Sequence, residues 1–197
     1  MRRQRFLFVL VASGLLSACA AIGGSGDIVS EPRELGSFSR VAASEGVRVS
    51  LVIDATAEPA VTVRYDDNVL DKVITRLDGG TLVVRLDGAF TFGGGADRHV
   101  EIAVAQLTGI AADSGAIVSG SGTATALEVI GSGGASVDLS GLDAGTLDIE
   151  VSGGANATLR ATDAISGEAS GGARVTILGD PARVEVSTSG GASLSRG

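Results

Sequence analysis

The sequence predicts an all-β fold, a parallel β-helix or β-solenoid-like domain with rungs of about 18–20 residues, preceded by an N-terminal part of alternating β-strands. Two observations predict it. The motif Ser-Gly-Gly-Ala begins at positions 132, 152, 170 and 189, so it recurs at offsets of 20, 18 and 19 residues. Apolar and polar residues alternate with period two through most of residues 37–197, which is the spacing of side chains along a β-strand.

Residues 1–18 have the pattern of a lipoprotein signal peptide. Three arginines lie within the first five residues, and the apolar stretch 6–16 that follows is too short to span a bilayer as a helix. The segment leads into Leu16-Ser17-Ala18-Cys19, which resembles the lipobox of bacterial lipoproteins, where a peptidase cuts before the cysteine. The alternative is a plain signal peptide cut nearby, which leaves a free or disulfide-linked thiol.

Cys19 is the only cysteine of the chain and has no intramolecular partner, so we expect it to carry a lipid anchor. Inner-membrane retention signals usually place Asp after the modified cysteine, whereas this chain has Ala20. We therefore expect an outer-membrane lipoprotein of the cell envelope, facing either the periplasm or the exterior.

Residues 19–36 are predicted to be a flexible tether. Gly and Ser dominate its start, Pro32 lies near its end, and no apolar periodicity is present. A flexible segment of this length reaches roughly 20–25 Å on average. That reach would lift the domain off the membrane.

The charge balance argues against nucleic acid as a partner. The chain has 15 Lys and Arg against 23 Asp and Glu, and three of the arginines belong to the signal peptide. A mature protein this acidic repels phosphate backbones. Membrane attachment is therefore expected to come from the lipid anchor at Cys19 and not from basic residues.

Residues 37–107 are predicted to form the N-terminal β part of the domain. Four runs alternate with period two and are separated by Gly, Asp or Pro turn signals: 47–53, 61–65, 82–86 and 100–104. Residues 68–76 are the one segment in which we expect a helical turn or two.

Residues 108–197 are predicted to be the stacked repeats. In each repeat a small Ala follows the Gly pair, which suits a tight corner, and alternating aliphatic residues flank the corner on both sides. A second turn is expected about eleven residues after each Ser, at Asp143, Asp163 and Asp180-Pro181. Each coil is then a strand, a Gly corner, a second strand and an Asp turn.

These features resemble the head GIN domain family, described as auto-transporter adhesin heads. The resemblance covers residues 37–197, and one departure is Ala105 or Gln106 where relatives often have Pro. It implies a β-helix-like domain on exported proteins, often lipoproteins, and it implies no reaction. The segments that carry it are Phe38-x-x-Val41, Val47-Arg48-Val49, Thr81-Leu82-Val83-Val84, Val100–Val104, Leu107-x-x-Ile110, Asp113-Ser114-Gly115-Ala116 and the Ser-Gly-Gly-Ala repeats.

The residues favour no catalytic or metal centre, and we expect no cofactor. His99 is the only histidine and has no evident nucleophile partner, while one His and one acylated Cys cannot ligate zinc. Gly133-Gly134-x-x-x-Asp138 resembles part of a calcium-binding nonapeptide, but that motif must recur every nine residues. The Ser residues beside Gly are explained by repeated turns, because a nucleophile would be unique.

Two surfaces are candidates for binding. If the repeats stack in register, Asp148, Glu150 and Glu168 form an acidic face, which is either a solvated surface or a surface for a divalent cation or basic partner. Phe90 and Phe92 flank a Gly-rich loop, where packing against the core is favoured over a ligand platform.

The sequence thus predicts a non-enzymatic cell-envelope lipoprotein with a structural or interaction module, adhesin-like in type. The last strand near residues 194–197 is expected to leave an open edge for a second copy or another protein. The alternative is a carbohydrate-binding or carbohydrate-active protein, which the lack of aromatic residues after Phe92 disfavours. An envelope-stress accessory is a third possibility.

Overall fold

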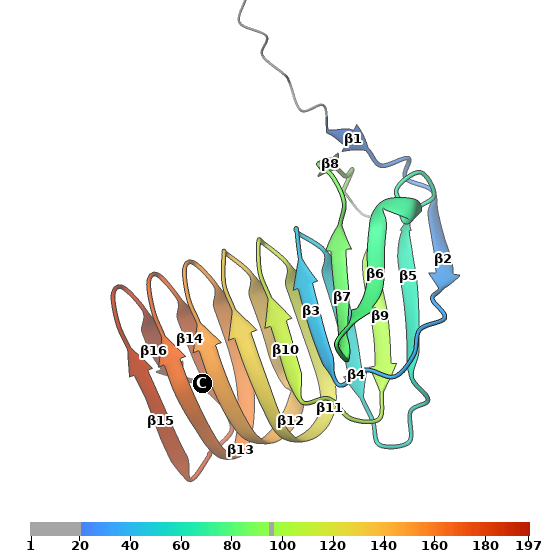
Figure 1. Cartoon of the computed structure of the whole chain (residues 1–197). Helices are drawn as coiled ribbons and strands as arrows, with labels where there is room; N and C mark the ends of the chain where they lie inside the picture. Colours follow the sequence, from blue (N-terminus) through green and yellow to red (C-terminus); the bar gives the residue numbers. More distant parts are fainter. Residues whose placement is uncertain (1–20, 95–96) are drawn as a thin grey trace, which may run out of the picture.

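The computed structural model describes residues 21–94 and 97–197, and it is all-β, as predicted (Figure 1). Its strands form a two-stranded sheet and one curled, mixed sheet of 14 strands. No helix in the described part of the chain is long and apolar enough to cross a membrane. The first nine strands are β1 (Ile22–Gly23), β2 (Ile28–Pro32), β3 (Arg40–Ser44), β4 (Arg48–Ile53), β5 (Ala60–Asp66), β6 (Val73–Asp78), β7 (Thr81–Leu86), β8 (Phe90–Thr91) and β9 (His99–Val104). The others are β10 (Gly109–Ala112), β11 (Ile117–Gly131), β12 (Ser136–Val151), β13 (Asn156–Ala169), β14 (Arg174–Leu178), β15 (Arg183–Thr188) and β16 (Ser193–Arg196).

The strands β11, β12 and β13 each run along one wall of the curled sheet, bend at its end, and return along the opposite wall (Figure 1). Each pairs in parallel with its successor, one repeat later. Val118 lies opposite Val137, which lies opposite Ala157, and the column continues through Val175 and Leu194. The register predicted from the motif spacing is therefore confirmed.

The glycine pairs form one column at the corners between successive strands. Gly153 and Gly171 have φ angles of 64° and 66°, a region that disfavours any residue with a Cβ. The backbone N–H of Gly172 donates to the carbonyl of Gly153 at 2.6 Å, and the N–H of Gly191 donates to the carbonyl of Gly171 at 2.6 Å. The corners are therefore close enough to hydrogen-bond from one repeat to the next, as the stacked-corner prediction requires.

The interior is a narrow core of aliphatic side chains. The alanines at four successive corners are fully buried, whereas Ala192 at the last corner is only partly buried. The inward-facing Val, Leu and Ile of the repeats join those of residues 41–107 in one continuous cluster. Burying each of these larger side chains contributes about 1.5–3 kcal/mol. The buried alanines of the corners are Ala116, Ala135, Ala155 and Ala173.

The chain changes direction at each of the expected Asp turns, but at two of them the strand continues through the change of direction. Asp143 and Asp163 lie inside β12 and β13, where the pairing shifts register and the strand bends without ending. Only at Asp180-Pro181 does the strand stop, between β14 and β15, because Pro lacks the N–H that a ladder needs.

The N-terminal part extends the stack and then covers its end. β3 pairs in parallel with β10 and β7, and β4 pairs in parallel with β11 and β9. Beyond them β5 and β6 pair antiparallel with β9 and β7. The helical expectation for residues 68–76 is largely wrong, since only Leu70–Lys72 form a 3-10 turn. Residues 73–78 are strand β6, because each finds a partner on β7.

The prediction of a flexible tether over residues 19–36 is also wrong for most of that segment. Ile22–Gly23 pair in parallel with Phe90–Thr91, and Ile28–Pro32 pair antiparallel with β5. The Gly and Ser residues of this segment are typical of a linker, so the sequence does not predict these strands. Pro32 is tolerated because β2 is an edge strand. Residues 1–18, the predicted signal peptide, and Cys19 lie outside the described residues.

Candidate functional site

A buried ion pair between Asp66 and Arg98 organises the end of the domain where the chain enters. Asp66 is 0% exposed at the end of β5, and Arg98 is 8% exposed just before β9. Arg98 donates from Nε and Nη2 to the two carboxylate oxygens of Asp66, the second bond being 2.9 Å long. A bidentate pair of this kind is among the stronger charge-assisted contacts in proteins.

The pair shifts the protonation of both groups. Hydrogen bonding from Arg98 lowers the pKa of Asp66 to about 2, against a desolvation effect that raises it, and the N–H of Gly26 lowers it further. The same hydrogen bond raises the pKa of Arg98. Both groups are therefore charged at neutral pH.

The Asp66–Asn68 turn holds the N-terminal segment through a set of bonds that we call the clasp, made by residues 23–27 and 66–68. The N–H of Gly26 donates to Oδ1 of Asp66 at 2.6 Å, and the Ser25 hydroxyl donates to Asp67 at 2.6 Å. Asn68 accepts from the N–H of Ser25 at 3.0 Å and donates to the Gly23 carbonyl at 2.9 Å. These bonds fix the segment that the sequence predicts to be flexible.

Gly24 is required at the centre of the clasp. A Cβ built on Gly24 would lie 2.7 Å from Oδ1 of Asp66 and 2.9 Å from the ring of Phe92. Neither contact leaves room for a methyl group, because the carboxylate is held by Arg98 and the ring packs against its neighbours.

Phe90 and Phe92 pack as a small aromatic layer over this ion pair. Their rings stack with centroids 5.9 Å apart, and Phe92 meets Tyr65 edge to face at 6.1 Å. The guanidinium carbon of Arg98 lies 4.8 Å from the Phe92 ring centroid, within the range of a cation–π contact. Both phenylalanines are partly buried against the core. Their proposed role in ligand binding stays a prediction.

A hollow of about 370 Å³ adjoins the aromatic layer. Its walls include Arg48, Tyr65, Phe92 and Arg98 together with the Gly46 corner. The buried Tyr65 hydroxyl accepts a long bond, 3.4 Å, from the N–H of Arg48, and burial raises the pKa of this phenol. The hollow is therefore lined by two arginines and two aromatic residues.

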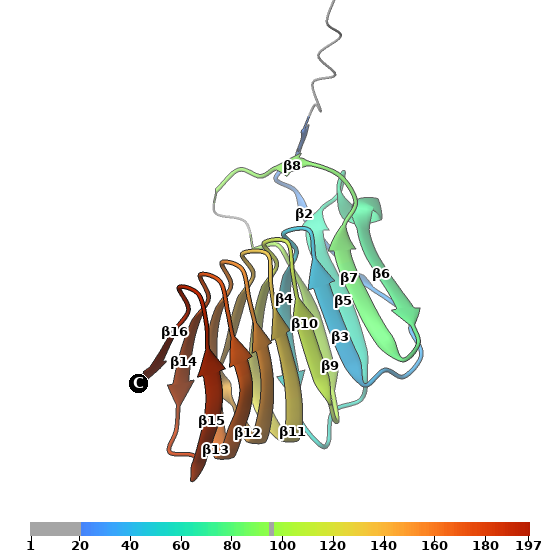
Figure 2. The same ribbon diagram turned by 60° about the vertical axis from the view of Figure 1, so that its left-hand side comes forward.

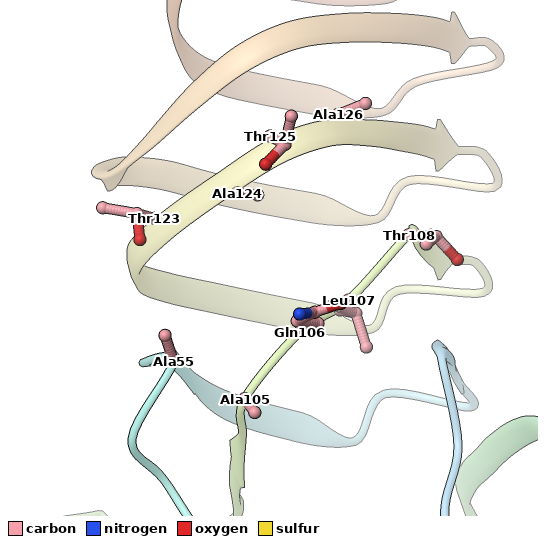
Figure 3. Close-up of a pocket in the computed structure, with 9 residues that line it drawn as sticks. All are labelled: Ala55, Ala105, Gln106, Leu107, Thr108, Thr123, Ala124, Thr125 and Ala126. Carbon is pink, nitrogen blue, oxygen red and sulfur yellow. The ribbon is translucent and has the colours of Figure 1, made fainter.

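A second hollow of about 440 Å³ lies where the bend of β11 faces residues 105–108 (Figure 3). It forms because β11 pairs with β4 only up to Gly122 and with β10 only from Glu128, which leaves the bend without a strand on that side. Its polar side chains are those of Thr108, Thr123, Thr125 and Gln106. This lining is neutral and contains no aromatic or titratable group.

The acidic residues singled out from the sequence do share one face. Glu150 lies directly opposite Glu168, and Asp148 lies opposite Ser166. The flanking carboxylates are neutralised by arginines, Glu128 by Arg40 and Glu185 by Arg183 at 3.5 Å. Asp148, Glu150 and Glu168 form no ion pair within the described part of the chain.

No cation site is built around these carboxylates in the described ranges. Residues 21–94 and 97–197 contain no group of three or more His, Cys, Asp or Glu placed to hold a metal ion. The idea of a cation surface at Asp148, Glu150 and Glu168 therefore remains a prediction.

His99 lies between two carboxylates. Its ring nitrogens are 3.0 Å from Asp97 and 2.9 Å from Glu101. Each contact joins the ring to an acidic side chain and not to a hydroxyl that it could activate.

Sequence reasoning missed Asp66 and Arg98. Only the pairing of β5 with β9 brings them together. These strands are antiparallel, in a register that puts Arg64 opposite His99 and so brings Asp66 near Arg98. The alternation of apolar residues does not specify that register, because 32 residues separate the two partners.

The chain matches one family model and several solved structures. A family described as "Putative auto-transporter adhesin, head GIN domain" matches residues 37–111 and 89–181. A "putative adhesin" from Bacteroides fragilis is similar in structure, with a TM-score of 0.54 and 15% identity over 89% of this chain and 100% of that chain. Another "putative adhesin", from Parabacteroides merdae, gives a TM-score of 0.42 and 14% identity over 90% and 99% of the two chains. A comparison with curated proteins finds no match.

Proposed function

Because the chain belongs to the head GIN domain family, we propose that it is a non-enzymatic cell-envelope lipoprotein whose repeats form a β-solenoid acting as a structural or interaction module. The family description, an adhesin head, supports an interaction role of adhesin type. The outer membrane is the proposed location, with the domain facing either the periplasm or the exterior.

The pairing of the repeats supports the β-solenoid. Each residue of the column from Val118 to Leu194 lies beside the residue one repeat later, always in parallel. The Gly corners hydrogen-bond to one another along the same direction. Parallel stacking of short repeats, each in contact with its neighbours, is the organisation of solenoid proteins.

The observation that carries the interaction role is an open edge at β15 and β16. In the described part of the chain, β15 pairs only with β13 and β16 only with β14. Val184, Val186 and Leu194 occupy inward columns but are only partly buried, whereas Val175 in the preceding repeat is 1% exposed. An edge with free backbone groups and half-covered aliphatic residues is suited to a strand from a second copy or from a protein partner.

The test of the open edge is the association state of the lipid-free domain. Sedimentation velocity over a wide concentration range should show reversible self-association, and Val186→Lys should reduce it because a charge then enters the new interface. Ser195→Lys on the outward side of β16 is the matched control and should leave association unchanged. A strict monomer at high concentration would contradict self-association, and capture of no protein partner would then remove the interaction role.

The lipid anchor has its own test. Metabolic labelling with radioactive palmitate should mark the wild-type chain and not Cys19→Ala. Equal labelling of the two chains would contradict a lipid on Cys19, and so would a wild-type chain without label.

The aromatic layer supports a second candidate function, which is carbohydrate binding. The stacked rings of Phe90 and Phe92 lie next to the hollow of about 370 Å³, and sugar sites commonly use aromatic faces. A glycan array probed with the purified domain decides between the two functions. A signal that Phe90→Ala or Phe92→Ala abolishes would favour the carbohydrate function.

A further inference from the structure

The start of the chain is fixed to the domain from Ile22 onward. The N–H of Ile22 donates to the carbonyl of Ala89 at 2.9 Å, and the N–H of Gly24 donates to the carbonyl of Thr91 at 3.0 Å. The clasp then holds residues 23–27 through side chains of Asp66, Asp67 and Asn68. Ile22 therefore cannot move away from the domain without breaking β1 and the clasp bonds.

Only three residue steps separate Cys19 from Ile22. An extended chain spans at most about 3.5 Å for each residue, so these steps reach about 10 Å. A lipid on Cys19 would place β1 and its partner β8 within about that distance of the bilayer surface. This connection is much shorter than the tether predicted from the sequence.

The edge formed by β1 and β8, residues 22–23 and 90–91, has side chains suited to an interface with lipid. Ile22 is 43% exposed, one of five large apolar side chains left exposed among the residues that the structure describes. It lies beside Phe90, which is only partly buried. Apolar and aromatic side chains at the rim of a domain insert readily between lipid headgroups.

The Gly corners and the bends lie at opposite ends of the domain. Both views show the corners between successive repeats on the same end of the domain as β1 and β8, and the bends of β11, β12 and β13 at the other end (Figures 1 and 2). About six residues of strand separate a Gly corner from a bend, which corresponds to about 20 Å. Asp143 and Asp163 therefore lie far from the β1–β8 edge.

We propose that the β1–β8 edge is the membrane-facing end of the domain, held against the surface of a lipid bilayer by the short connection to Cys19. The bends at Asp143 and Asp163 then point away from the bilayer. This inference rests on the lipid anchor of the proposed function, and it adds an orientation that the anchor alone does not specify.

The experiment uses the full-length lipidated protein, purified from membranes and added to phosphatidylcholine vesicles that contain a lipid with a nitroxide on its headgroup. A fluorophore is attached to Thr91→Cys on β8 in one sample and to Asp163→Cys at a bend in another, since both positions are exposed and Cys19 is acylated. The nitroxide should quench the label at residue 91 several-fold more strongly than the label at residue 163.

Two controls separate a failure of the lipid anchor from a failure of the proposed orientation. Mass spectrometry of the purified chain first establishes the lipid, and a chain without lipid refutes the proposed anchor together with the orientation that depends on it. A lipidated chain whose two labels are quenched equally, or more strongly at residue 163, overturns the orientation. Insertion of twelve Gly and Ser residues between Ala20 and Ala21 should abolish the difference, and a persisting difference would overturn the role of the short connection.

Discussion

Arg98 donates to Asp66 through two of its guanidinium nitrogens, while its guanidinium carbon lies over the ring of Phe92, 4.8 Å from the ring centroid. This single relationship joins three segments that are distant in sequence: the end of β5, the loop after β8 and, through Gly26, the start of the chain. The clasp and the aromatic layer therefore share one charged centre, and removing either partner leaves the other charge buried without its counter-ion.

The first prediction concerns the stability of this centre. Arg98→Met should lower the free energy of unfolding by about 3–5 kcal/mol, because Asp66 is then buried without its partner. Denaturant unfolding followed by circular dichroism measures the change. Arg76→Met, which removes the exposed pair with Asp78, is the matched control and should cost no more than about 1 kcal/mol. Equal losses for the two variants would contradict the prediction.

The second prediction is the pH dependence of the same pair. Arg98 holds the pKa of Asp66 at about 2 in the folded protein, below the value of about 3.9 expected in the unfolded chain. A depressed pKa contributes stability that is present above pH 4 and is lost as the pH falls toward 2. The stability difference between wild type and Arg98→Met should therefore narrow over that interval. A difference that stays constant from pH 6 to pH 2 would show that Asp66 does not titrate as stated.

The repeats could be predicted from sequence because their information is local and periodic. The offsets of the Ser-Gly-Gly-Ala motif determine which residues pair, and the structure pairs Leu127 with Leu147 and Leu147 with Ile165 accordingly. The acidic face followed from the same register, since Glu150 and Glu168 occupy equivalent positions of successive repeats.

The clasp could not be predicted in the same way, because its contacts are long-range and occur once. Ile28–Pro32 is a strand only because β5 offers it a partner, and nothing in the alternation of so short a run distinguishes it from a linker. The sequence predicts turns at Asp143 and Asp163 because Asp favours turns, whereas pairing with the neighbouring repeat keeps the backbone extended around them.

The third prediction tests the Gly corners. Gly171→Ala should destabilise the domain by about 1–3 kcal/mol, because φ is 66° and the new Cβ would lie 3.1 Å from the backbone N of Gly153. Gly154→Ala is the matched control in a neighbouring corner, since nothing lies within 4 Å of a Cβ there and its φ is not in the left-handed region. Thermal and denaturant unfolding of the two variants should separate them clearly. Similar losses at both positions would show that stacking of the corners does not limit which residue fits.

The fourth prediction tests the narrow core beside those corners. Ala155→Leu should lower the stability by about 1–3 kcal/mol, because Ala155 is 1% exposed and a larger side chain overpacks the column. Ala126→Leu, at an exposed position of the β11 bend, should change the stability little. Unfolding in urea measures both. A stabilised Ala155→Leu would indicate free space at the corner, contrary to the packing described.

The last prediction concerns the acidic face. Glu150 and Glu168 lie directly opposite each other on neighbouring strands, and like charges in that position repel. Glu168→Gln should therefore raise the free energy of unfolding by about 0.2–1 kcal/mol at low ionic strength, and the gain should disappear in high salt. Glu185→Gln is the matched control and should give no gain, since Glu185 is paired with Arg183. Calcium titrations of wild type and Glu168→Gln, followed by calorimetry and melting temperature, then separate the two interpretations of this face. A cation surface requires that millimolar calcium stabilise the wild type more than the variant, and a solvated face requires that calcium affect neither.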